Sequence, residues 1–230
     1  MGRAKRVDVG GYAYHVINRG NGRMTIFDDE GDYDAFERVL DEALIKFPQV
    51  HLLAYCLMPN HWHLVLHPQA DKQLSRFVGW LTLTHTQRWH AHRHTTGGGH
   101  VYQGRYKSFL IETDVYLSTV CRYVERNPVR ANLVRKAENW KWSSLHRWLS
   151  GSPEEKRILS PWPTPSGKRP PGWLKRVNTP ETQAELDALR LSCNRERPFG
   201  SEAWAMRIMK KYDLATTFRP RGRPQKQASK

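Results

Sequence analysis

Two apolar runs that stand almost end to end constrain the fold of this chain most strongly. Residues 50–58 (VHLLAYCLM) are mostly apolar, and residues 61–67 (HWHLVLH) alternate strictly between polar and apolar side chains. Runs of this length and period are typical of β-strands. Pro59 and Asn60 between them favour a tight turn. The two runs therefore predict an antiparallel hairpin.

The segments around this hairpin predict the rest of the fold. Residues 12–19 (YAYHVINR) and 106–112 (YKSFLIE) are rich in β-branched and aromatic side chains and predict two further strands. Apolar side chains recur at helical spacing over residues 32–46 and 72–93, and again after Asp114. The order β-α-β-β-α-β-α predicts an α+β fold, with an antiparallel sheet and helices on one face, resembling the ferredoxin-like plan.

Proline and charge divide the chain into three parts. Residues 151–180 carry seven of the fourteen prolines, which predicts a Pro-rich linker. Residues 195–230 hold ten Lys and Arg against three Asp and Glu. We therefore expect a main domain over residues 1–150, a linker over residues 151–180, and a basic C-terminal DNA-binding extension over residues 181–230.

The charge of the whole chain predicts a polyanionic partner. Its 37 Lys and Arg exceed 22 Asp and Glu, which gives a formal net charge of +15. Such a surface attracts nucleic acid, because binding releases condensed counterions. Aromatic residues make up 11% of the chain, and exposed bases of single strands stack on such rings. We therefore expect a nucleic-acid partner.

Membrane association and a disulfide framework are not expected. No apolar run reaches the roughly 20 residues that cross a bilayer, and the first residues lack the apolar core of a secretory signal. The three cysteines are few and scattered. The expected location is cytoplasmic, associated with the nucleoid.

Two histidines in the alternating run form a candidate metal site. His61 and His63 project from the same face of the predicted strand, because alternate residues of a strand point the same way. Two imidazoles at this spacing can hold one divalent ion. The alternative is a surface or structural role, since a His-x-His pair arises easily in a chain with 11 histidines.

A helix further along the chain carries a candidate nucleophile. Tyr123 and Asn127 are four residues apart, so they share one face of the helix predicted after Asp114. Tyr116 is a rival two turns earlier. Pro128 disfavours helical geometry at Asn127, which makes the four-residue spacing approximate. The alternative for Tyr123 is a half-buried position on an amphipathic helix.

Four motifs in order resemble a known family. They are Tyr14-His-Val-Ile-Asn-Arg19-Gly-Asn-Gly-Arg23, Leu57-Met-Pro-Asn-His61-Trp-His63, Gln103-Gly-Arg105-Tyr-Lys107 and Tyr123-Val-Glu-Arg-Asn127-Pro-Val-Arg130. Together they resemble the REP-associated tyrosine transposases of the single-tyrosine HUH nuclease and transposase superfamily. The resemblance covers about residues 10–145 and extends to members with a C-terminal extension.

The resemblance implies a function and a site. His61 and His63 match the HUH pair, which would bind Mg²⁺ or Mn²⁺, and Asn127 matches the polar residue that completes the metal site. Tyr123 matches the nucleophile. Members of the family cut single-stranded DNA beside a REP-type hairpin through a covalent 5′-phosphotyrosine intermediate. The free 3′-OH can later rejoin strands, as DNA transposition requires. Related proteins act as a monomer or as a homodimer.

Basic residues near these motifs are candidate DNA contacts, although a solvated charge or an ion pair is an equally open alternative for each. The set consists of Arg19, Arg23, Arg105, Lys107, Arg122, Arg126, Arg130, Arg221 and Arg223. The run Arg221-Gly-Arg223-Pro224 also resembles an AT-hook core, which inserts arginines into a narrow minor groove. His15 follows the alternation of its strand and is expected to be structural.

Two other functions fit the same residues. The chain could be a non-catalytic, hairpin nucleic-acid-binding protein derived from such an enzyme. It could also be a metal phosphoesterase that uses water, although phosphoesterases with two His motifs repeat the pair, and here one comparable pair occurs.

Overall fold

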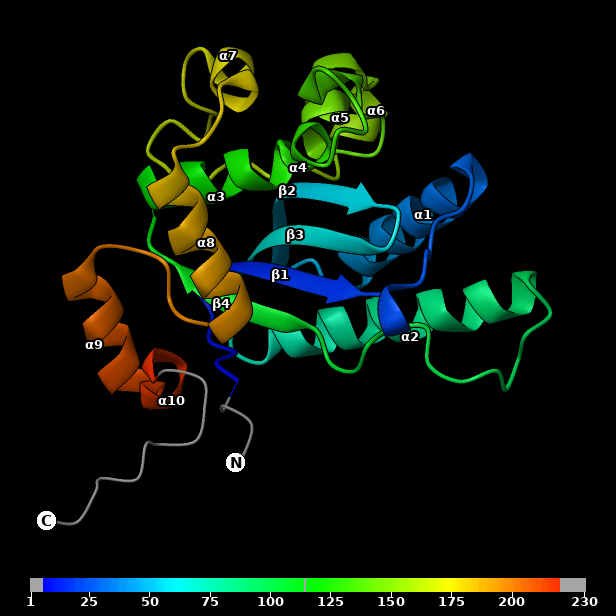
Figure 1. The fold of residues 1–230 in the computed structure, drawn as a ribbon, viewed down its shortest axis with the longest axis horizontal. Helices are drawn as coiled ribbons and strands as arrows, with labels where there is room; N and C mark the ends of the chain where they lie inside the picture. Colours follow the sequence, from blue (N-terminus) through cyan, green and yellow to red (C-terminus); the bar gives the residue numbers. More distant parts are fainter. Residues whose placement is uncertain (1–5, 114, 220–230) are drawn as a thin grey trace, which may run out of the picture.

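A four-stranded antiparallel sheet forms the centre of the computed structural model, which describes residues 6–113 and 115–219 (Figure 1). The strands are β1 (Ala13–Arg19), β2 (Val50–Met58), β3 (His61–Pro68) and β4 (Lys107–Ile111), in the order β2-β3-β1-β4. The predicted hairpin is confirmed, since β2 and β3 pair antiparallel with Met58 opposite His61. A register shift between Leu52 and Ala54 interrupts this pairing once. The α+β fold with the ferredoxin-like strand order is confirmed.

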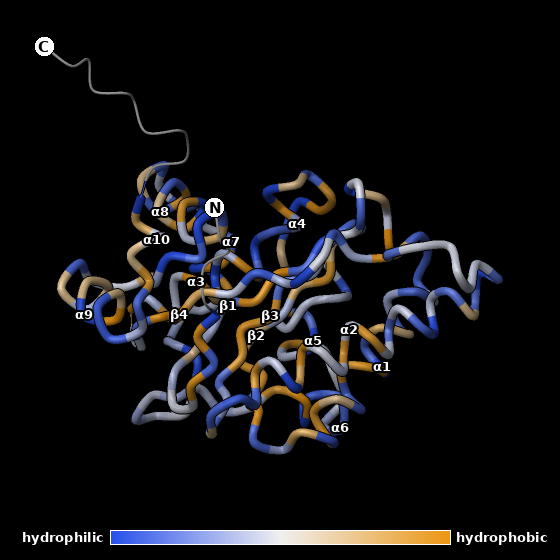
Figure 2. Tube along the Cα trace, turned by 90° about the horizontal axis from the view of Figure 1, so that it is seen from below, coloured by the Kyte–Doolittle hydropathy of each residue, from blue (hydrophilic) through white to orange (hydrophobic). Residues whose placement is uncertain are grey.

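Two long helices cover one face of the sheet. They are α1 (Glu30–Lys46), which connects β1 to β2 after the short 3₁₀ helix η1 (Asn21–Arg23), and α2 (Gln73–His92), which connects β3 to β4. The Asp29 side chain caps α1 by accepting from the Asp32 amide. Apolar side chains from both helices pack with alternate strand residues, including Tyr14 and Trp62. Hydrophobic residues run along the strands that these helices cover (Figure 2).

Further helices cover the opposite face, which is a difference from the prediction of helices on one face. The helix α3 (Val115–Glu125) packs on β2, β3 and β4, and the short α4 (Asn127–Arg130) continues it. The short η2 (Ala137–Asn139) and α5 (Ser144–Ser150) follow. This second core contains the other alternate strand residues, including Ala13 and Val65. Asp114, predicted to open α3, lies outside the described residues.

The segment predicted as a linker packs into this second core. It contains α6 (Pro153–Lys156) and α7 (Trp173–Asn178). Trp162 and Trp173 are buried and contact each other edge to face with ring centroids 5.0 Å apart. The Glu125 carboxylate of α3 accepts from Trp173 Nε1 at 2.7 Å and pairs with Arg169 at 2.6 Å. The segment is therefore packed against the main domain, because its tryptophans bury large apolar surfaces.

Three helices follow this segment. They are α8 (Gln183–Arg195), α9 (Glu202–Tyr212) and α10 (Ala215–Phe218). In Figure 1, α8 crosses near β4 on the α3 side of the sheet, and the two elements are in contact. Trp204 and Ile208 bury the apolar side of α9 in the first core. Among the described residues, no helix combines the length and hydropathy needed to cross a membrane.

Candidate active site

A cavity of about 410 Å³ lies where β1 and β3 face α3 and α8. His61 and His63 of β3 line it together with Tyr123 of α3 and Asn127 of α4. The strict alternation of β3 explains this arrangement. Trp62 points to the first core, and the two histidines point to the opposite face. Four predicted site residues therefore meet in one cavity.

His61 and His63 lie close together, with the His63 ring buried and the His61 ring partly buried. The ring centroids of His61 and His63 lie 4.9 Å apart. His61 Nδ1 donates to Asn60 Oδ1 at 2.6 Å, because an amide oxygen can only accept, and this leaves His61 Nε2 without a proton. Burial, with the Arg19 and Arg130 charges, lowers the pKa of His61 to about 3. Burial also lowers the pKa of His63 far below its usual range. Both rings are neutral at pH 7.

Tyr123 lies against this pair. Its ring centroid is 6.1 Å from that of His63, with the two planes nearly perpendicular. Burial, with a smaller effect of Cys193, raises the pKa of Tyr123 to about 12, and the Arg130 and Arg190 charges oppose that shift. The rival Tyr116 instead contacts Phe199 and lines a different pocket between α3, α8 and α9. Only one of the two tyrosines therefore lines the histidine cavity.

Asn127 is held beside Tyr123 by Arg130. Arg130 donates to Asn127 Oδ1 at 2.7 Å and to the Tyr123 carbonyl at 3.0 Å. Its guanidinium carbon lies 4.0 Å from the centre of the Tyr123 ring. Pro128 was expected to disfavour helical geometry at Asn127, but the helix is interrupted one residue earlier, at Arg126, and Asn127 begins α4. Asn127 Nδ2 donates to the Val124 carbonyl at 3.4 Å, which Pro128 cannot reach because it has no N–H. One lone pair of Asn127 Oδ1 remains for another partner.

The cavity wall is strongly cationic. Its charged lining residues are Arg19, Arg105, Lys107, Arg130 and Arg190. Four of them are among the predicted DNA contacts, and no Asp or Glu lines the same cavity in the part of the chain that the structure describes. Such a wall attracts phosphate oxygens. Arg23, also predicted, lies exposed on the turn after β1.

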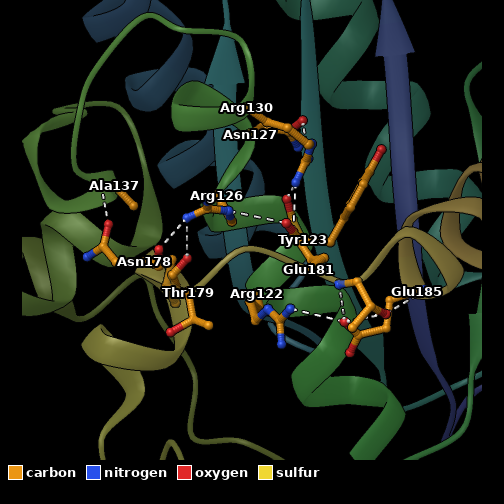
Figure 3. Close-up of polar contacts among 12 residues, drawn as sticks. Arg122, Tyr123, Arg126, Asn127, Arg130, Ala137, Asn178, Thr179, Glu181 and Glu185 are labelled. Atoms are coloured by element: carbon orange, nitrogen blue, oxygen red, sulfur yellow. Dashed lines mark hydrogen bonds and ion pairs between the residues drawn. The ribbon is translucent and has the colours of Figure 1, made fainter.

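Three predicted DNA contacts at α3 and α4 form ion pairs with carboxylates (Figure 3). Arg122 pairs with Glu185 at 3.2 Å. Glu181 pairs with Arg126 at 3.2 Å and with Arg130 at 2.8 Å. Arg126 also donates to the Asn178 carbonyl at 2.7 Å. These cations tie α3 to the C-terminal helices. Arg221 and Arg223 lie outside the described residues.

Sequence reasoning missed three lining residues on α8, namely Arg190, Cys193 and Asn194. Cys193 lines the cavity together with Tyr123, and its sulfur lies 3.9 Å from His15 Nδ1. Contacts between residues this far apart in the chain leave no local pattern. Among residues 6–113 and 115–219, no three His, Cys, Asp or Glu side chains cluster as a ready metal site. A third protein ligand would therefore come from another residue type, such as Asn127.

Comparison with known proteins assigns the family. The model of a family described as "Transposase IS200 like" matches residues 8–127, which is more than half of the chain. The chain belongs to the IS200-like transposases. The matched residues of this IS200-like transposase include β1 to β4, both histidines, Tyr123 and Asn127. They end before α8, so this wall of the cavity lies outside the part shared with the family model.

Two individual proteins are similar to this transposase. A protein of Haemophilus influenzae (strain ATCC 51907 / DSM 11121 / KW20 / Rd) named "Putative REP-associated tyrosine transposase" is 26% identical over 103 residues. The match covers 41% of this chain and 58% of that protein. A solved structure of a REP-associated tyrosine transposase bound to a REP hairpin superposes with a TM-score of 0.54 at 19% identity. The superposition covers 64% of this chain and 84% of the chain in that structure. The two proteins therefore share the same α+β fold.

Proposed function

We propose that this IS200-like transposase is a metal-dependent single-stranded DNA endonuclease and strand transferase. It would act at REP-type hairpins through a covalent 5′-phosphotyrosine intermediate. The observation that carries the proposal is the meeting of His61, His63 and Tyr123 in one cation-lined cavity. The REP hairpin as substrate is supported by the solved structure, which is bound to a REP hairpin, and by the REP-associated name of the Haemophilus influenzae protein.

The residues of the cavity fit a divalent cation. His61 and His63 are neutral and each has its Nδ1 engaged, so Nε2 is the nitrogen left to bind a metal. The free lone pair of Asn127 Oδ1 would add a third ligand. Imidazole suits Mn²⁺ better than Mg²⁺, whose preferred ligands are hard oxygens, so we expect faster cleavage with Mn²⁺. When bound, the cation would withdraw electron density from a phosphate and make its phosphorus more electrophilic.

Tyr123 would supply the nucleophile. Its hydroxyl oxygen attacks a backbone phosphorus, and the bond from phosphorus to the 3′ oxygen breaks as the bond to tyrosine forms. The phenol proton leaves to solvent, and the departing 3′ oxygen takes up a proton. The products are DNA joined through its 5′ phosphate to Tyr123 and a free 3′-OH. Attack of a 3′-OH on this ester reverses the step and joins strands without an external energy source.

The cationic wall would hold the strand. Arg19, Arg105 and Lys107 line the cavity beside the histidines, where they can pair with phosphates on either side of the cleaved bond. Arg130 would keep the Tyr123 ring and the Asn127 amide in place through its three contacts with them. Positioning of this kind can account for much of the rate acceleration, because it holds the reacting groups in the orientation that the reaction needs.

A denaturing gel tests the proposal. The full chain is incubated with a single-stranded oligonucleotide that carries a REP-type hairpin, with and without Mn²⁺. We expect a protein–DNA adduct that requires the metal and that His61→Ala abolishes. Tyr123→Phe should give no adduct and should still shift the hairpin in a native gel.

Tyr116→Phe is the matched control, because it makes the same change on the same helix away from the histidines. It should form the adduct as the natural chain does. An adduct that persists in Tyr123→Phe and disappears in Tyr116→Phe would refute the assignment of the nucleophile. Hairpin binding by the natural chain without any adduct would favour the alternative, a non-catalytic hairpin-binding protein.

A further inference from the structure

His15 is a buried polar residue that lies directly beside the histidine pair and has no role in the reaction described above. It is 0% exposed. Ile17 of β1 stands opposite His63 of β3, so His15 is the diagonal neighbour of His63 on the same face of the sheet. The His15 and His63 rings stack with centroids 5.0 Å apart and an interplanar angle of 27°.

The two rings share one hydrogen bond, and its direction decides what His63 can do. His15 Nε2 and His63 Nδ1 lie 2.8 Å apart. A hydrogen bond between two ring nitrogens has one donor and one acceptor, so only one of these two nitrogens carries a proton. If His15 donates, His63 must keep its proton on Nε2 and cannot bind a metal. If His63 donates, its Nε2 carries a lone pair.

The charges around the cavity favour donation by His63. Arg19, Arg105, Lys107 and Arg130 line the cavity that His63 also lines. A lone pair on Nε2 turns the negative end of the imidazole dipole toward these cations, whereas an N–H would turn the positive end toward them. The cationic field therefore favours the tautomer in which His63 donates its Nδ1–H to His15.

We propose that His15 is a positioning residue that accepts the Nδ1–H of His63 and so keeps the Nε2 lone pair of His63 available inside the cavity. This inference rests on the proposed function, in which the Nε2 lone pair of His63 binds the metal ion. A ligating histidine commonly needs a partner on its other nitrogen that fixes ring orientation and tautomer.

The surroundings of His15 fix the position of its ring. In the proposed arrangement His15 carries its own proton on Nδ1, which lies 3.9 Å from the Cys193 sulfur of α8. Phe109 of β4 covers the ring with centroids 4.9 Å apart. His15 is therefore fixed from β4 and α8 as well as from its own strand.

Long-range ¹H–¹⁵N correlation spectra of the metal-free chain, labelled at histidine, test the tautomer directly. In the natural chain we expect His63 as the Nδ1–H tautomer. His15→Phe keeps a ring of similar shape but removes the acceptor, so His63 should shift toward the Nε2–H form. His15→Gln places an amide oxygen near the former Nε2 and should restore the Nδ1–H form. A His63 that carries its proton on Nε2 in the natural chain would overturn the inference.

Manganese affinity gives a second readout, measured from the free Mn²⁺ signal in electron paramagnetic resonance. We expect His15→Phe to bind Mn²⁺ about 10- to 100-fold more weakly, and His15→Gln to recover most of the loss. His85→Phe is the matched control. His85 is also buried, it hydrogen-bonds Tyr102 at 2.8 Å, and it packs in the first core on the other face of the sheet. It should lower stability without changing Mn²⁺ affinity.

The outcomes separate the two proposals. Mn²⁺ binding that His61→Ala weakens and His15→Phe leaves unchanged would reject the role of His15 alone. Binding that neither variant changes would argue against the metal site in the proposed function. Equal losses of Mn²⁺ affinity in His15→Phe and His85→Phe would show a general effect of destabilisation, and would also overturn the inference.

Discussion

At the scale of single residues, Arg130 makes the most contacts within the candidate site. Its guanidinium stacks on the Tyr123 ring, donates to the Tyr123 carbonyl and to Asn127, and pairs with Glu181 at 2.8 Å. The planar guanidinium can make these contacts together because it presents five donors in a fixed geometry. Arg130 therefore connects the proposed nucleophile with the proposed third metal ligand.

Arg130→Ala should slow cleavage more than it weakens binding. Loss of the guanidinium frees the Tyr123 ring and the Asn127 amide, and a misplacement of about 1 Å can cost about 100-fold in rate. We expect the single-turnover rate to fall by about 100-fold and hairpin affinity by less than about tenfold. Arg122→Ala, which removes an arginine paired with Glu185 outside the cavity, should leave the rate within a few-fold. Equal rate losses in both variants would contradict the role of Arg130.

The raised pKa of Tyr123 predicts a pH-dependent rate. Burial raises that pKa to about 12, so the phenol is protonated throughout the neutral range. Below its pKa, the phenolate fraction rises tenfold per pH unit, and cleavage by the phenolate should rise with it. We expect log rate to climb with a slope near +1 from about pH 6.5 to 9 in single-turnover assays. A flat profile would indicate that deprotonation does not limit the step.

At the scale of elements, α8 is tied to α3 and α4 by carboxylates at its start. Glu181 pairs with Arg126 and Arg130, and its side chain is 2% exposed. Thr182 and Glu185 form a capping box at the first turn of α8. The register of α8, and with it the placement of Cys193 against Tyr123, depends on these anchors.

Glu181→Gln should destabilise the chain substantially. It leaves Arg126 and Arg130 partly buried without their counter-charge, and removal of one member of a buried ion pair costs about 3–5 kcal/mol. We expect a loss of about 3 kcal/mol in the free energy of unfolding, measured with urea. Glu154→Gln makes the same change in the exposed pair with Arg157 and should leave that free energy unchanged within error. Similar losses in both variants would argue against the anchoring role.

At the scale of the whole molecule, the positive charge is divided between the cavity wall and the C-terminal end. Residues 220–230 carry Arg221, Arg223, Lys226 and Lys230 and lie outside the described residues. Residues 199–214 contribute Phe199, Trp204 and Ile208 to the two cores. A truncation that tests the tail must therefore spare α9 and end at residue 219.

A chain truncated after residue 219 should bind hairpin DNA with a weaker dependence on salt. If all four cations contact phosphates, the slope of log affinity against log salt should become shallower by about 3. The single-turnover cleavage rate of bound DNA should stay the same, because the cavity is untouched. Titrations at several salt concentrations provide the measurement. An unchanged slope would mean that the tail does not contact DNA.

Local patterns predicted the sheet and the core of the candidate site. The alternation at residues 61–67 places His61 and His63 on one face, and β2 and β3 begin at the predicted residues. The roles of His61, His63, Asn127 and Tyr123 stay predictions, although all four line one cavity. His61 and His63 are two residues apart on a strand, and Tyr123 and Asn127 are four residues apart on a helical segment. Such short spacings are enough to infer which side chains share a face.

Contacts between distant segments could not be predicted in the same way. The positive charges of Arg122 and Arg126 suggested that they bind DNA phosphates. In the fold, Glu185 of α8 pairs with Arg122, and Glu181, which precedes α8, pairs with Arg126. Prolines at residues 151–180 suggested a linker, while the buried Trp162 and Trp173 hold that segment on the sheet. His15 was expected to be structural, and only the packed sheet brings its ring to His63.

The late position of α8 in the chain has a consequence for biosynthesis. Tyr123 leaves the ribosome seventy residues before Cys193, and the histidines leave earlier still. A nascent chain therefore exposes the face that carries Tyr123 before α8, which forms one wall of the cavity, has been made. Glu181 and α8 can close this face only after residues 181–195 have been made, so the timing of their docking decides when a newly made molecule acquires its complete cavity.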